Sequence, residues 1–206
     1  MIRIKICGLK EIKHALAAEK AGADAVGFVF AKSVRRISPI QAKKISRSLG
    51  PWISKVGVFV NSGNSEILKI AKIGGLDTVQ LHGDEPPSQA KKLRASGLKV
   101  LKAFRIQNKA DLAIIRNYPA DAILLDAAVA GNYGGTGQKF DWNLLAHLKL
   151  TQPVIISGGL KKESLKDLFR LFTPYGVDVS SGVEKSPGKK DIQLIKDFIV
   201  HAKSFI

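Results

Sequence analysis

The sequence has little of three things: cysteine, acidic residues and long apolar runs. Cys7 is the only cysteine among the 206 residues, so no internal disulfide can form. No apolar run approaches the roughly 20 residues needed to cross a bilayer. The first residues also lack the apolar stretch of a secretory signal. These absences predict a soluble protein of the reducing cytoplasm with no membrane partner.

The deficit of acidic residues leaves the chain strongly basic. Lys and Arg number 33 against 17 Asp and Glu, which gives a formal net charge of +16. Such a charge attracts nucleic acid, anionic lipid or a small anionic substrate alike. The basic residues are scattered over expected helix faces and do not alternate with aromatics in one stripe, so no nucleic-acid surface is expected. A non-catalytic basic binding protein is the alternative that charge alone favours.

Short runs rich in valine and isoleucine alternate eight times with longer segments of helical period. The units leave no room for a linker, so we expect one domain over residues 1–206. Such alternation predicts a parallel sheet, and eight units close it into a (β/α)₈ TIM barrel of the α/β class. An open doubly wound sheet is the alternative. Strands are expected at residues 2–7, 25–30, 54–60, 77–82, 98–104, 121–126, 153–157 and 176–180, and helices beginning near Glu11, Pro39, Ser65, Pro86, Lys109, Asp141, Lys161 and Lys189.

Strand periodicity predicts which side chains face the barrel interior, because alternate residues of a strand point to opposite faces. By this pattern the inner wall is unusually polar toward the carboxyl ends of the strands, where barrel enzymes place their active sites. The inward residues are expected to be Arg3, Lys5 and Cys7 in the first run, Thr78, Gln80 and His82 in the fourth, Ala122, Leu124 and Asp126 in the sixth, and Asp178 and Ser180 in the eighth.

Glycine-bearing loops follow the seventh and eighth expected strands, at residues 157–159 and 180–182. Such loops can expose backbone amides to an anion, and in this fold they recurrently bind phosphate. A third glycine-rich stretch, residues 133–137, follows the sixth strand and is expected to close over the same region. The alternative is that the glycines only permit tight turns. The predicted phosphate-binding residues are Gly135, Gly158, Gly159, Ser180, Ser181 and Gly182.

A thiol and a carboxylate stand at the carboxyl ends of two distant strands. Cys7 closes the first run and Asp126 closes the sixth. In a closed barrel these ends meet around one opening, so the two side chains suggest an acid/base pair. The plainer alternatives are that Cys7 is an inert core residue and that Asp126 caps a strand or joins a salt bridge.

Several motifs occur in order along essentially the whole chain. They are Lys5-Ile6-Cys7-Gly8, Gln80-Leu81-His82-Gly83, Leu124-Leu125-Asp126, Gly134-Gly135-Thr136-Gly137 with Phe140-Asp141-Trp142, Ser157-Gly158-Gly159 and Val177-Asp178-Val179-Ser180-Ser181-Gly182-Val183-Glu184. Separately each motif is weak, but jointly they are specific, and the set resembles the phosphoribosylanthranilate isomerases. The resemblance implies an Amadori rearrangement of N-(5-phosphoribosyl)anthranilate in tryptophan biosynthesis, with no metal or organic cofactor.

The resemblance also implies roles for individual residues. Asp126 would be the general acid and Cys7 the general base. Lys5 lies two residues before Cys7 on the same strand face, and its positive charge is expected to lower the pKa of the thiol. Because the eighth strand closes against the first, Asp178 is expected to pair with Lys5 and support the site. His82 is a supporting residue that is expected to bond neighbouring backbone and to transfer no proton.

An anthranilate carboxylate calls for a cation. The family pattern places an arginine after the second strand, before a residue that is often aromatic, and here Arg35 matches that arginine while Arg36 replaces the aromatic residue. A guanidinium binds a carboxylate through a bidentate fork. Arg35 is therefore the predicted carboxylate ligand, with Arg36 as the alternative and Arg105 as another reachable cation.

The nearest rival function is another barrel enzyme for a phosphorylated sugar. An epimerase of this kind would bring metal-ligating histidines, but His14, His147 and His201 lie in expected helices. A Schiff-base lyase would need an inward lysine near the rim, and Lys5 is set too low. A phosphorylated small molecule is thus the expected partner, and the chain is expected to be a monomer or a homodimer.

Overall fold

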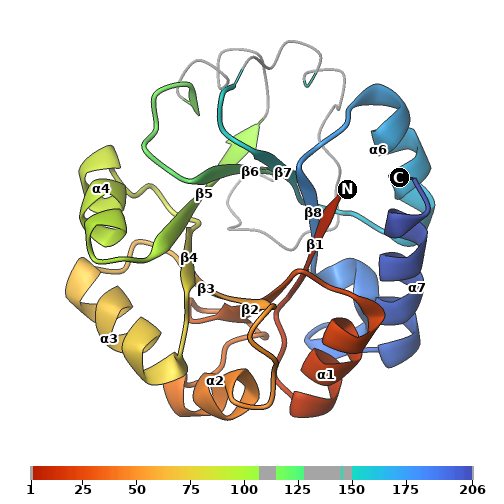
Figure 1. Ribbon diagram of the computed structural model, residues 1–206, viewed down its shortest axis with the longest axis horizontal. Coiled ribbons are helices and arrows are strands. Elements are labelled where there is room, and N and C mark those ends of the chain that lie inside the picture. The colour runs from red at the N-terminus through yellow and green to blue at the C-terminus, as the bar shows by residue number, and fades with distance from the viewer. Residues whose placement is uncertain (1, 107–114, 128–144, 146–149, 206) are drawn as a thin grey trace.

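The computed structural model describes residues 2–106, 115–127, 145 and 150–205 of the chain. Eight parallel strands pair in sequence order, and β1 also pairs with β8, so the sheet closes into a barrel (Figure 1). Closure confirms the predicted (β/α)₈ barrel and excludes the open sheet. Every strand begins and ends within two residues of its predicted bounds. The strands are β1 (Arg3–Cys7), β2 (Ala25–Val29), β3 (Ser54–Phe59), β4 (Thr78–Leu81), β5 (Lys99–Ile106), β6 (Ala122–Ala127), β7 (Val154–Ile156) and β8 (Gly176–Val179).

Helices cover the outside of the barrel (Figure 1). They begin where the sequence offers a starting signal: Ser38 accepts the N–H of Gln41 at 3.1 Å, and Pro39 occupies the first turn of its helix. The helices expected near Lys109 and Asp141 fall outside the described residues. No helix in the described ranges is long and apolar enough to cross a membrane. The helices are α1 (Ile12–Ala21), α2 (Pro39–Ser46), α3 (Asn64–Gly74), α4 (Pro87–Ala95), the short η2 (Lys162–Ser164) with α6 (Leu165–Leu171), η3 (Ser181–Val183) and α7 (Ile192–Lys203).

The helix predicted to begin near Lys189 is present, but it begins three residues later, at Ile192. Lys189 and Lys190 form β10, a short strand that runs antiparallel to β9 (Glu184–Ser186). Helix α7 begins later because Asp191 caps it: its carboxylate accepts the N–H groups of residues 193 and 194 at 2.8 and 3.0 Å. This small ribbon carries the side chain of Lys190 into a buried position beside the eighth strand.

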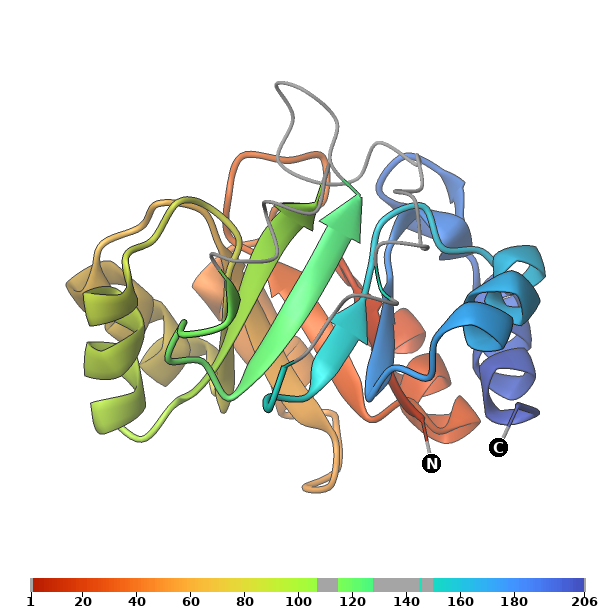
Figure 2. The ribbon, with the colours of Figure 1, turned by 90° about the horizontal axis from the view of Figure 1, so that it is seen from above.

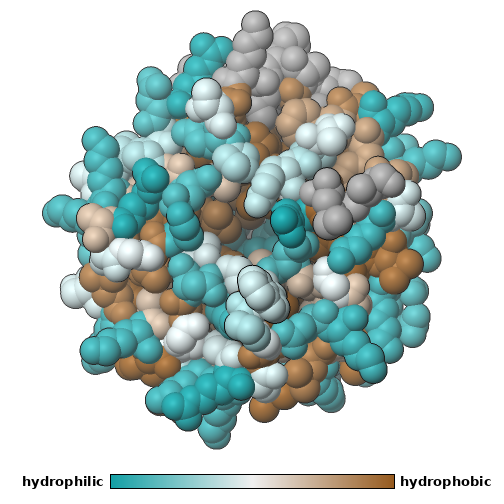
Figure 3. Space-filling view, viewed as in Figure 1, coloured by the Kyte–Doolittle hydropathy of each residue, from teal (hydrophilic) through white to brown (hydrophobic). Residues whose placement is uncertain are grey.

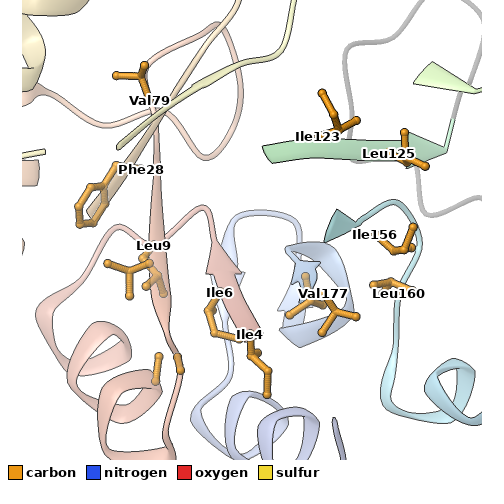
Figure 4. Close-up of a cluster of buried hydrophobic side chains, with 14 of the residues drawn as sticks. Ile4, Ile6, Leu9, Phe28, Val79, Ile123, Leu125, Ile156, Leu160 and Val177 are labelled. Carbon is orange, nitrogen blue, oxygen red and sulfur yellow. The ribbon is translucent and has the colours of Figure 1, made fainter. Parts of the chain in front are cut away.

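The core consists of two apolar layers. Outward-facing strand residues such as Ile4, Ile6, Ile123 and Val177 pack between the barrel and its helices (Figure 4). A smaller cluster fills part of the barrel interior, made of Ala103, Ala122, Leu124 and Ile155 with Leu101 against it. The inward residues Gln80, His82 and Asp126 lie toward the carboxyl ends of the strands, whereas Arg3 and Thr78 lie toward the amino-terminal end. The strands run toward one end of the barrel, and both chain termini lie at the other (Figure 2).

The amino-terminal end of the barrel has its own cavity of about 400 Å³. Arg3, which was expected to face inward, lies at this mouth, where its half-exposed side chain bonds Asp24 at 2.6 Å. Trp52 lies at the same end on the loop before β3 and is 97% exposed. Figure 3 shows this face, hollowed at its centre and ringed by side chains of mixed hydropathy.

Candidate active site

A cavity of about 530 Å³ lies at the carboxyl ends of the strands, opposite the mouth that holds Arg3. Its walls come from strands and loops that are far apart in the sequence, because barrel closure brings all eight strand ends around one opening. The predicted site residues that line it are Cys7, Arg35, His82, Asp126, Gly158, Gly159, Asp178, Ser180 and Ser181. The thiol and the carboxyl suggested as an acid/base pair thus face the same cavity.

The Cys7 thiol is buried at the end of β1. Gly27 lies opposite it in β2, and a Cβ at Gly27 would come within 2.7 Å of Cys7 Sγ and 3.1 Å of Lys5 Cε, so the missing side chain makes room for both. Burial raises the pKa of the Cys7 thiol, and the ammonium of Lys5 offsets only part of that effect. The expected lowering of this pKa is therefore wrong for the free protein, because desolvation outweighs the nearby charge.

Lys5 and Asp178 form a buried ion pair below the thiol. The ladder that closes the barrel places the two residues opposite each other, with Lys5 Nζ 2.8 Å from Asp178 Oδ2. Burial by itself would lower the pKa of Lys5, because it disfavours the charged ammonium. The nearby negative charge of Asp178 more than offsets this effect, so the pKa of Lys5 is raised. The predicted pair is therefore present. The second carboxylate oxygen, Asp178 Oδ1, is buried with no hydrogen-bond partner among the described residues.

Asp126 lies buried at the end of β6 and shares a hydrogen bond with His82, whose Nε2 is 3.0 Å from Asp126 Oδ2. The other ring nitrogen, Nδ1, lies 2.9 Å from the side-chain nitrogen of Gln80, two residues earlier on β4. Gln80 in turn accepts a hydrogen bond from Lys5 Nζ at 2.8 Å. The imidazole ring of His82 therefore bonds two side chains, and not the neighbouring backbone as expected.

Arg35 approaches the cavity from the loop after β2. Its Nε and Nη2 donate to the two carboxylate oxygens of Glu184, both at 2.8 Å. The arginine packs across Gly8, where a Cβ would lie 2.7 Å from Arg35 Cδ and where the backbone φ of +77° also favours glycine. Arg36 is exposed and does not line the cavity, whereas Arg35 does.

Glu184 is the centre of a buried charge cluster behind Arg35. Lys190 donates to the Glu184 carboxylate at 2.8 Å and to the backbone oxygen of Ser180 at the same distance. Burial by itself would raise the pKa of Glu184, but the hydrogen bonds from Arg35 and Lys190 outweigh it and lower that pKa to about 2. The carboxylate therefore stays charged and holds Arg35 in one orientation.

The two predicted phosphate loops lie side by side at the cavity. Gly158 and Gly159 adopt φ values of +82° and +63°, a left-handed backbone that glycine reaches without strain. Ser180 donates to the backbone oxygen of Cys7 at 3.2 Å, which ties the second loop to β1. A Cβ at Gly182 would lie 1.9 Å from the Leu160 oxygen, so this glycine lets the two loops touch. Gly135 lies outside the described residues.

Arg105 pairs with Asp126 in the β5–β6 ladder but lines a neighbouring cavity. That cavity also holds a buried ion pair in which Lys102 Nζ lies 2.9 Å from Glu85 Oε2. Glu85 accepts the N–H of Gly83, so the pair orders the loop directly after His82. Within the described ranges, no group of three or more His, Cys, Asp or Glu side chains is placed to hold a metal ion.

Gln80, Glu184 and Lys190 belong to the site, although sequence reasoning did not single them out for it. Gln80 had a usable signal, because the alternation of β4 places it on the inward face with His82. Glu184 ends the motif that begins at Val177, but its pairing with Lys190 had no signal, since the two meet only through the β9–β10 ribbon.

Known proteins with similar sequences and structures match this chain over nearly its whole length. The N-(5'-phosphoribosyl)anthranilate isomerase of Rubrobacter xylanophilus is 45% identical over 206 residues, which cover 99% of this chain and 100% of the relative. A crystal structure of monomers generated from the dimeric Thermotoga maritima enzyme matches with a TM-score of 0.87 at 41% identity, covering 99% of this chain and 100% of that one.

Another solved phosphoribosyl anthranilate isomerase contains reduced 1-(o-carboxyphenylamino)-1-deoxyribulose 5-phosphate. It matches with a TM-score of 0.87 at 42% identity, and the match covers 99% of this chain and 100% of that chain. The family model for N-(5'-phosphoribosyl)anthranilate (PRA) isomerase matches residues 4–201. The agreement in sequence, in fold and in extent confirms the resemblance, and the chain belongs to the N-(5'-phosphoribosyl)anthranilate isomerase family of enzymes.

Proposed function

We propose that the chain converts N-(5-phosphoribosyl)anthranilate into 1-(2-carboxyphenylamino)-1-deoxyribulose 5-phosphate, a step of tryptophan biosynthesis, with Cys7 as general base and Asp126 as general acid. One observation carries the proposal: a thiol from β1 and a carboxyl from β6 line the same cavity, beside an arginine and two glycine-bearing loops. The substrate has matching parts, namely a reacting sugar, a carboxylate and a phosphate.

The reaction needs an acid that protonates the ribose ring oxygen and a base that removes the proton from C2. Asp126 protonates the ribose ring oxygen while the bond from C1 to that oxygen breaks, and the nitrogen lone pair forms a C1 iminium ion. Cys7 as thiolate removes the proton from C2, and the C–H electrons flow toward nitrogen to give an enolamine. The enolamine becomes the ketone when C1 gains a proton and the C2 hydroxyl loses one.

The environment of Cys7 suits a base that is charged only during part of the cycle. Burial raises the pKa of the thiol, so the thiolate is the minor form near neutral pH, and a buried thiolate attracts a proton more strongly than a solvated one. The Lys5 ammonium provides the countercharge that makes the thiolate accessible. Asp178, in turn, holds Lys5 in the charged form.

The two anionic ends of the substrate find separate partners. A guanidinium has five N–H donors, and the fork to Glu184 leaves others on Arg35 for the anthranilate carboxylate. The phosphate fits the loops at residues 157–159 and 180–182, with the glycine backbone of Gly158 and Gly159 open to it. The unpartnered oxygen of Asp178 is available to accept a hydrogen bond from a sugar hydroxyl.

The test follows the loss of phosphoribosylanthranilate fluorescence with the purified protein. Removing a general acid or base lowers turnover by roughly 10²–10⁴-fold, so we expect kcat to fall by that order in Cys7→Ala and in Asp126→Asn. Asp121→Asn is the matched control, because Asp121 precedes the same strand at the far end of the barrel. Full activity in both site variants would contradict the assigned roles.

The rival enzyme functions fit the cavity less well. His82 is the histidine that lines it among the described residues, whereas His14 and His201 lie in α1 and α7 on the outside of the barrel. Lys5 is held as an ammonium by Asp178, so it lacks the neutral amine that a Schiff base requires. Among the residues that the structure describes, the groups needed for metal-dependent epimerisation or for Schiff-base cleavage are therefore not in place.

The assembly and location of the enzyme are also proposals. The Thermotoga maritima relative is described as dimeric, and this chain is expected to be a monomer or a homodimer in the cytoplasm. Sedimentation velocity at micromolar concentration distinguishes the two assemblies.

A further inference from the structure

Gln80 lies inside the barrel, between Lys5 on one side and His82 on the other. Its side-chain oxygen accepts a hydrogen bond from Lys5 at 2.8 Å, and its side-chain nitrogen lies 2.9 Å from Nδ1 of His82. Gln80 is 1% exposed, so water does not replace either bond. The chain of contacts runs from Asp178 through Lys5, Gln80 and His82 to Asp126.

The chemistry of Lys5 decides which way the Gln80 amide points. An ammonium donates hydrogen bonds and accepts none, so the atom that faces Lys5 must be the amide oxygen. The ion pair with Asp178 keeps Lys5 charged and in place. Turning the amide over would set its NH₂ group against the ammonium. The amide nitrogen of Gln80 is therefore directed at His82.

The orientation of Gln80 decides, in turn, where His82 carries its proton. An amide NH₂ group only donates, so Nδ1 of His82 must be the unprotonated, accepting nitrogen. The ring is then neutral with its proton on Nε2, and this N–H donates to Asp126 Oδ2 at 3.0 Å. When Asp126 holds the acid proton, Oδ2 is occupied as an acceptor and the proton lies on Oδ1.

We propose that Gln80 is a positioning residue: it holds His82 in the Nε2–H tautomer and thereby directs the acid proton of Asp126 to Oδ1. The proposal rests on the proposed function only in taking Asp126 as the acid. Without the donor from Gln80, Nδ1 of His82 is free to take a proton. An imidazolium beside Asp126 would stabilise the carboxylate and withhold the proton that the ring oxygen needs.

The tautomer can be measured without substrate. Nitrogen-15 NMR of the uniformly labelled protein distinguishes a protonated from an unprotonated ring nitrogen, and His82→Asn assigns the His82 signals among those of the four histidines. We expect an unprotonated Nδ1 and a protonated Nε2 in the wild-type protein at neutral pH. In Gln80→Glu, whose carboxylate can only accept from the ring, we expect Nδ1 to be protonated. A wild-type ring protonated on Nδ1 would overturn the proposal.

Kinetics then connect the tautomer to the acid. We expect kcat to fall at least tenfold in Gln80→Glu and less in Gln80→Met, which keeps the side-chain volume but has no donor, with KM changed less than kcat in both. In an Asp126→Asn background the same substitutions should lower kcat little further, because the group that they act on is already removed. Equal losses in both backgrounds would assign Gln80 a purely structural role and refute the proposal.

The controls separate this proposal from the proposed function. Thr78→Val changes an inward residue of the same strand two positions earlier, and it should leave both the His82 tautomer and kcat unchanged. If Gln80→Glu does not fold, Gln80→Met still tests the tautomer, because loss of the donor should allow protonation of Nδ1. A wild-type protein without isomerase turnover would refute the proposed function, while the NMR result would still decide the role of Gln80.

Discussion

Lys5 and Asp178 meet across the seam where the barrel closes, with Lys5 Nζ 2.8 Å from Asp178 Oδ2 and both side chains 5% exposed. The residues are 173 positions apart in the sequence, so the pair joins the first strand to the last. The same ammonium donates a hydrogen bond to the side-chain oxygen of Gln80, and its charge lowers the pKa of the Cys7 thiol against the larger effect of burial. One buried cation thus links the strands that close the barrel to the residues proposed to act on the substrate.

Replacement of Lys5 by methionine should destabilise the protein strongly. Removing one partner of a buried ion pair leaves an uncompensated charge and typically costs about 3–5 kcal/mol. We expect urea unfolding at pH 7 to show a loss of this size for Lys5→Met. The double variant Lys5→Met/Asp178→Leu should regain most of it, because no charge is then left unpaired. Equal stability of the single variant and the wild type would rule out this role for the pair.

The thiol of Cys7 should titrate above its ordinary value of about 8.5, because burial raises its pKa. The rate of alkylation by iodoacetamide, measured against pH, should therefore still be rising at pH 9. A base that is protonated at neutral pH must lose its proton before it acts, so kcat/KM should rise with pH over the same range. In Lys5→Met the thiol curve should move to still higher pH, since the countercharge is gone. A curve centred below pH 8 would contradict this account.

Glu184 should make the protein acid-sensitive. Its pKa falls from 4.5 to about 2 on folding, so the stabilisation is fully present above pH 4.5 and is lost as the pH falls toward 2. A depression of this size corresponds to about 3 kcal/mol. Glu184→Gln should therefore be less stable than wild type at pH 7, and the difference should vanish near pH 2. The exposed Glu163→Gln is the control, and its stability difference should be small at every pH.

Gly27 should be needed for the placement of Cys7. A Cβ in Gly27→Ala would lie 2.7 Å from Cys7 Sγ, so the thiol has to move. Misplacing a reacting group by about 1 Å can cost about 10²-fold in rate, and we expect a loss of that order in kcat with little change in KM. Gly63→Ala is the control, because a Cβ there meets nothing within 4 Å. Unchanged turnover in a folded Gly27→Ala variant would argue against Cys7 as the base.

Inorganic phosphate should stabilise the protein by binding at the two glycine-bearing loops. A ligand present at 100 times its dissociation constant stabilises the folded state by about 2.7 kcal/mol, which thermal melting would detect. Gly159→Ala should weaken this effect and raise KM more than it lowers kcat, because its φ of +63° strains an alanine. Sulfate should act like phosphate and chloride should not. Equal responses of wild type and variant would place the anion elsewhere.

Most of the architecture could be read from the sequence. The alternation of valine-rich runs and helical segments predicted all eight strands and the barrel, because the number of β/α units limits how the sheet can close. The start of α7 was missed because Lys189 and Lys190 look like ordinary helix residues. Only the pairing of β10 with β9, and the cap at Asp191, show that the helix begins later.

The site was predictable in part. Cys7, Asp126 and the loops around Gly158 and Ser180 could be found because strand ends and glycines are local signals, and they do line one cavity. The direction of the pKa shift of the Cys7 thiol could not be predicted. Burial raises this pKa and the ammonium of Lys5 lowers it, and the larger of the two effects depends on the packed structure. The distance between those groups is a property of the packed barrel.

The sequence by itself determined the strand order, the inward faces of the strands and the membership of the isomerase family. These follow from periodicity and from short motifs, which act over a few residues. Only the tertiary structure decided that Glu184 holds Arg35 and that Gln80 links Lys5 to His82. Hydrogen bonds between distant residues depend on distances of a few tenths of an ångström, and the closed barrel sets those distances by bringing separate strands into register.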